Sequence, residues 1–76
     1  MIVRITMSYE PDWVVKPDGE AQPGDHALAV WNTINEGAVL EAFPHVGGGT
    51  SAESRRVVLN AAHVRSVHEM PENARL

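Results

Sequence analysis

Residues 25–37, DHALAVWNTINEG, decide the fold class because no other segment of the chain has the pattern of an amphipathic helix. The Asp25 side chain can accept hydrogen bonds from N–H groups of a first turn, and Gly37 can take the left-handed conformation that closes a last turn. Between them, apolar residues recur at steps of three and four and share one helical face: Ala27, Leu28, Trp31 and Ile34. This spacing predicts one helix that docks on a sheet.

The rest of the chain has the signals of strands and turns. Apolar and polar residues alternate over residues 2–9, and short β-branched or aromatic runs occupy residues 13–15, 39–46, 55–60 and 64–69. Pro44 cannot donate to a ladder, which predicts an edge position or a bulge in its strand. We therefore expect an α+β protein: a small antiparallel sheet in the order β-β-α-β-β-β, with the helix packed on one face.

The sequence also permits a second fold. If residues 25–36 formed a strand in which Leu28, Val30 and Ile34 alternate, the chain would be an all-β barrel, SH3-like or Sm-like. Either fold is one domain over residues 1–70, followed by a disordered tail at 71–76. Residues 47–54 contain three glycines and small polar residues, which predicts a loop. The matching periods predict a core of Val3, Ile5, Met7, Leu28, Trp31, Ile34, Leu40, Val57, Leu59, Val64 and Val67.

Charge and composition narrow the function. Ten acids against six lysines and arginines give a net charge of −4, which disfavours binding to phosphate at long range. A local basic patch from Arg55, Arg56 and Arg65 is the exception that the sequence permits. The absence of cysteine excludes disulfides and thiolate chemistry. No run is apolar enough for a signal peptide or a membrane span, so we expect a cytoplasmic protein.

The motifs of common catalytic sites are weak. No lysine follows the glycines at 47–49 as a phosphate-binding loop requires, and no serine lies in a nucleophile motif. The alternative is a metal-dependent enzyme that uses His45, His63 or His68 with a glutamate. His63 and His68 are five residues apart, so a regular strand would direct them to opposite faces. We expect exposed histidines and neither metal nor cofactor.

The sequence therefore predicts a small non-catalytic binding protein, an accessory or regulatory factor that acts through contacts with proteins. Trp13, Arg55, Arg56 and Arg65 are the candidate partner-binding residues. A homodimer is also expected, formed through the exposed edge of the strand at residues 64–69. The two alternatives are a nucleic-acid-associated regulator that uses the three arginines, and the histidine-dependent enzyme described above.

Overall fold

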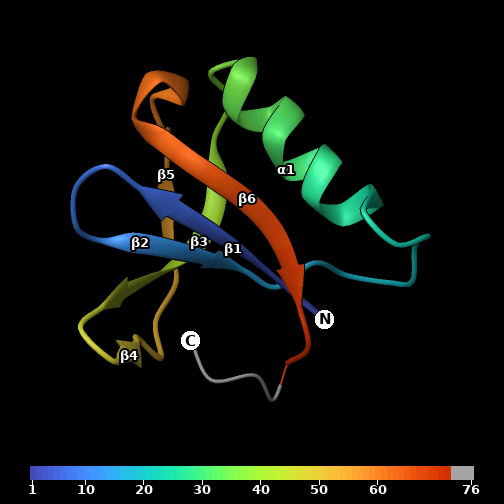
Figure 1. Ribbon diagram of the computed structural model, residues 1–76, viewed down its shortest axis with the longest axis horizontal. Coiled ribbons are helices and arrows are strands. Elements are labelled where there is room, and N and C mark those ends of the chain that lie inside the picture. The colour runs from blue at the N-terminus through green and yellow to red at the C-terminus, as the bar shows by residue number, and fades with distance from the viewer. Residues whose placement is uncertain (73–76) are drawn as a thin grey trace.

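A computed structural model describes residues 1–72 of the chain (Figure 1). It contains strands and one helix, which confirms the α+β class. In chain order the elements are β1 (Ile2–Met7), β2 (Asp12–Val15), α1 (Asp25–Asn35), β3 (Leu40–Val46), β4 (Gly49–Thr50), β5 (Arg55–Val57), the 3₁₀ turn η1 (Ala61–His63) and β6 (Val64–Met70). Because residues 25–35 are helical, the all-β alternative is wrong.

All strand pairs are antiparallel. The sheet has the order β4-β3-β2-β1-β6, and β5 pairs with the first half of β3. Helix α1 lies nearest to β6 and also contacts β1 and β3 (Figure 1). Its buried residues Val30 and Ile34 join a core with Val3, Ile5 and Trp13. One face of the sheet is thus covered by α1, and we call the other the open face.

The start of α1 differs from the sequence prediction. Asp25 is the first helical residue and not the cap; Gly24 precedes it with φ of 90° and offers no side chain. The carboxylate of Glu69 on β6 takes the place of a local cap, because it accepts the N–H groups of Gly24 at 2.9 Å and Ala27 at 3.0 Å. The end of α1 is as predicted, with Gly37 at φ of 68°.

Pro44 does not lie at an edge, because β3 has neighbours on both sides. The pairs His45–Thr50 and Ala42–Arg55 differ in register by two residues, because β3 pairs with two separate strands on this side. The extra residues loop out between β4 and β5. The predicted loop at 47–54 is thus shorter than expected: residues 47 and 48 form the hairpin turn, and β4 adds a sixth strand to the predicted five.

Much of the predicted core is buried. Val3, Ile5, Ile34, Leu40 and Leu59 are confirmed. Five others are half-buried against this core: Met7, Trp31, Val57, Val64 and Val67. The assignment of Leu28 to the core is wrong, since 57% of its surface is exposed. Val30 is buried in its place on the helix.

Two further expectations concern the ends of the chain and the membrane. Most of the predicted tail, residues 73–76, lies outside the described residues. Within residues 1–72, no helix has the length and apolar character needed to cross a bilayer.

Candidate functional site

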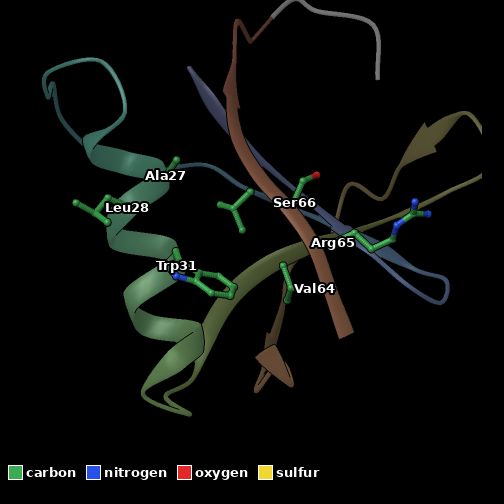
Figure 2. Close-up of a pocket in the computed structure, with 7 residues that line it drawn as sticks. Ala27, Leu28, Trp31, Val64, Arg65 and Ser66 are labelled. Carbon is green, nitrogen blue, oxygen red and sulfur yellow. The ribbon is translucent and has the colours of Figure 1, made fainter. Parts of the chain in front are cut away.

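A groove between α1 and β6 is the main candidate site (Figure 2). Its volume is about 440 Å³. Trp31 points from the helix toward Val64 on the strand, and Leu28 stands on the outer rim. The residues that line it are mostly apolar: Ala27, Leu28, Trp31, Val64, Arg65, Ser66 and Val67. Its size falls in the usual range for ligand sites, about 300–1,000 Å³.

The strand side of the groove is a sheet edge. β6 pairs with β1 and with no other strand among residues 1–72. Four consecutive residues of β6 line the groove, although neighbouring residues of a strand point to different faces. The groove therefore runs along the backbone edge of β6 and not only over one face of it.

Two hydrogen bonds of β1 show which backbone groups of β6 point to this edge. Met7 donates its N–H to Asp12 on the β2 side of β1, and Ser8 donates to the carbonyl of His63 on the β6 side. Because backbone direction alternates along a strand, even-numbered residues of β1 bond to β6. Their partners are Ser66, His68 and Met70. The N–H and C=O groups of Val67 and Glu69 therefore point away from β1, and no described loop or helix backbone bonds to them.

Glu69 connects the two walls of the groove. Its backbone lies on the free edge of β6, while its side chain accepts the two N–H groups at the start of α1. The hydrogen bonds from Gly24 and then Ala27 lower the pKa of Glu69 below its ordinary value, because they stabilise the carboxylate. The charged form of Glu69 thus fixes the position of α1 beside β6.

The open face carries a row of polar residues across the sheet. Arg4 on β1 lies between His68 on β6 and Val14 on β2, and its Nη2 donates to Asp12 Oδ2 at 2.7 Å. Asp12 also accepts the N–H of Met7 at 2.8 Å. Burial alone would raise the pKa of Asp12, but the bonds from Met7 and Arg4 and the nearby His45 outweigh it and lower that pKa.

His45 continues this row on β3. Its side chain is 4% exposed, contrary to the exposed histidine that we expected, and its Nδ1 lies 2.8 Å from Thr50 Oγ1 on β4. Cross-strand pairing places His45 opposite Asp12. Within this row, Arg4 bonds to Asp12 and His45 bonds to Thr50, while Arg4 Nε is buried without a partner among the described residues. We interpret the row as structural.

The three histidines of the enzyme alternative lie apart. His45 is on β3, His68 faces Arg4 from β6, and His63 in η1 packs its ring edge-to-face on Tyr9 with centroids 5.5 Å apart. In the part of the chain that the structure describes, no three metal-ligating side chains gather. The three histidines therefore do not share one site.

The predicted partner-binding residues are separated. Trp13 is 8% exposed in the core and has little surface to offer a partner. Arg55 and Arg56 are neighbours on β5, so they point to opposite faces of the sheet. Arg65 is on β6, which does not pair with β5. Of the four residues, only Arg65 lies at the groove.

The sequence held partial signals for the groove. It put Trp31 and Val64 together in the core and predicted an exposed edge at residues 64–69. It missed the cap by Glu69, because the two residues joined by that contact are more than forty positions apart. Comparison with known proteins adds no identification: no family model, no curated protein and no solved structure matches this chain.

Proposed function

We propose that this protein is a non-catalytic interaction domain that binds an extended protein segment as an added strand along β6. The single observation that carries the proposal is the free backbone edge at Val67 and Glu69, which borders an apolar groove. Strand addition uses such an edge for main-chain hydrogen bonds and adjacent pockets for alternate side chains. Trp31 and Val64 would supply the pocket for one apolar side chain of the segment.

Three further observations support this reading. β6 has seven residues, whereas the outer strands β4 and β5 have two and three, so β6 offers the longest edge of the described sheet. Residues 64–70 contain no proline to remove an edge donor, and the carboxylate of Glu69 is engaged by the N–H groups of Gly24 and Ala27. Leu28 keeps 57% of its surface exposed beside the half-buried Trp31, and a bound segment would cover both.

The bound segment comes either from another protein or from a second copy of this chain. In the second case the protein is a homodimer through β6, and each copy satisfies the free edge of the other. Both cases use the same groove, so one pair of variants tests both. Leu28→Glu places a charge on the rim, and Val58→Glu is its control, because Val58 is 58% exposed and does not line the groove.

The test selects binders from a library of random peptides of about eight residues, enough for one strand. We expect peptides with alternating apolar residues that bind the parent and Val58→Glu equally and bind Leu28→Glu about tenfold more weakly, a loss of about 1.4 kcal/mol. Sedimentation of the same three proteins tests the homodimer: dimeric parent and Val58→Glu with monomeric Leu28→Glu would assign the segment to a second copy. If no peptide is selected and the parent is a monomer, the proposal is wrong.

A further inference from the structure

The open face gathers most of the positive charge of the described chain. Arg4 faces this side between Val14 and His68. The Lys16 ammonium lies 4.3 Å from the centre of the Phe43 ring, and Phe43 is paired with Val14 on the same face. Arg56 lies opposite Glu41, next to the core-facing Ala42, and therefore points to the open face as well.

Arg65 is the fourth cation on this side. Val64 and Val67 point toward the core, and the register shift in the β1–β6 ladder falls between them. Figure 2 shows the Arg65 side chain on the side of β6 away from α1. Arg55 is the exception among the described lysines and arginines: it pairs with Ala42, whose side chain is in the core, and so projects to the helix side.

Acidic residues are distributed in the opposite way. Most of them lie in the turns, in the long loop before α1, or on the helix and its side of the sheet: Glu10, Asp18, Glu20, Asp25, Glu36, Glu53 and Glu69. On the open face, Asp12 is paired with Arg4, and Glu41 accepts a hydrogen bond from Ser54. The net charge of −4 therefore does not describe this face, where the cations outnumber the acids.

We infer that the open face binds single-stranded nucleic acid, with Lys16, Arg56 and Arg65 as its phosphate contacts. Charge complementarity selects a polyanion, and the surface selects a single strand. Helix α1 lies on the far face, and a six-stranded sheet is too broad to enter the major groove of a duplex, which admits a helix or a two-stranded ribbon. The exposed ring of His68 suits base stacking, which single-strand-binding sheets combine with a basic surface.

Arg4 has a positioning role in this site. Its guanidinium is held against the sheet by Asp12, while its Nε has no partner among the described residues. The Arg4–Asp12 ion pair is close to neutral, so Arg4 acts by bracing β1 against β2 between Lys16 and Arg65, and the exposed cations supply the phosphate contacts. The long-range field of the acidic protein still opposes the ligand, so binding should be weak and strongly dependent on salt.

The experiment measures fluorescence anisotropy of a labelled oligothymidine of about twelve nucleotides, within the usual site size, at about 50 mM salt, where phosphate contacts are strongest. Arg55 and Arg56 form a matched pair, since they are adjacent and exposed but face opposite sides. We expect Arg56→Glu, Lys16→Glu and Arg65→Glu each to weaken binding at least about fivefold and each to lower the slope of log K against log salt by about 0.7. Arg55→Glu should stay within about twofold of the parent.

Three results would overturn the inference. The first is an equal effect of Arg55→Glu and Arg56→Glu, which would mean that only net charge matters. The second is the absence of oligonucleotide binding at low salt. The third is binding of heparin or an acidic peptide that depends on the open-face cations while the oligonucleotide does not bind, which would assign the face to another polyanion. Arg65 also lines the α1–β6 groove, so Lys16→Glu and Arg56→Glu, which lie outside it, decide this inference, and Leu28→Glu with Val58→Glu decides the groove proposal.

Discussion

The two faces of the sheet are buried by different kinds of contact. On the helix side, Val3, Ile5 and Trp13 pack against Val30 and Ile34 of α1 in a continuous apolar core. On the open face, Val14 is 1% exposed although no helix covers it, and its neighbours include the Arg4–Asp12 ion pair and Phe43. The stability of the helix side comes from buried apolar surface. The stability of the open face comes from contacts between residues that the strand register places opposite each other.

The two tryptophans give the largest expected effect and test this contrast on the helix side. Trp13 is 8% exposed, so Trp13→Ala should cost about 3–5 kcal/mol, the usual loss for a buried aromatic. Trp31 is half-buried at the groove, so Trp31→Ala should cost only about 1–2 kcal/mol in transfer energy. Urea unfolding of both variants measures the difference. Equal losses would mean that Trp31 belongs to the core.

The open face should depend on its ion pair. Asp12→Ala removes the partner of Arg4 and the acceptor of the Met7 N–H, which should cost about 1–3 kcal/mol. Arg4→Met in the same background should then cost less than it does alone, because the cation has already lost its partner. Chemical denaturation of the four proteins in this cycle gives the coupling. If Asp12→Ala lowers the free energy of unfolding by less than about 0.5 kcal/mol, the ion pair does not stabilise the open face, and the contrast with the helix side is wrong.

Acid should weaken both faces through one carboxylate each. Asp12 and Glu69 have pKa values lowered below their ordinary values of 3.8 and 4.5, so the unfolded chain takes up protons before the folded one does. Their contribution is complete above the ordinary values and is lost as the pH falls below about 4. Unfolding between about pH 7 and pH 3 should show this loss, and Asp12→Asn should have a flatter profile. If the stability of Asp12→Asn falls as steeply with pH as that of the parent, the Asp12 carboxylate does not contribute to the loss of stability in acid.

Leu28 gives the smallest expected effect. Because 57% of it is exposed, Leu28→Ala should change stability by less than about 0.5 kcal/mol. Thermal unfolding beside Ile34→Ala, whose side chain is 2% exposed, provides the comparison. A loss for Leu28→Ala as large as that for Ile34→Ala would show that the rim of the groove is part of the core.

The sequence predicted the helix side better than the open face. The periods in residues 2–9 and 25–37 were enough to place Val3, Ile5 and Ile34 in the core. The prediction that Leu28 is buried was wrong because residues at steps of three and four define the centre of the apolar face of the helix but not its borders. Either Leu28 or Val30 can lie at a border, and only packing against β1 and β3 decides which one is buried. The α+β class followed from the one helix, whereas β4 was missed because Gly49 and Thr50 carry no strand pattern.

The candidate sites were less predictable, because both depend on pairs distant in the sequence. The groove needs α1 beside β6, and the cap by Glu69 joins residues that no local pattern relates. The open face needs the register that places Arg4 between Val14 and His68. Alternation along β5 did contain one useful signal: it separates Arg55 from Arg56, so the three arginines do not form one patch.

Hydrogen exchange of the β6 amides tests the free edge most directly. At a concentration where the chain sediments as a monomer, the amides of Val67 and Glu69 should exchange much faster than those of Ser66 and His68, which bond to β1. This alternation would confirm that β6 turns unpaired donors toward the groove. Equal protection along residues 66–69 would show that the edge is already covered within the chain, and it would contradict strand addition as the function of this surface.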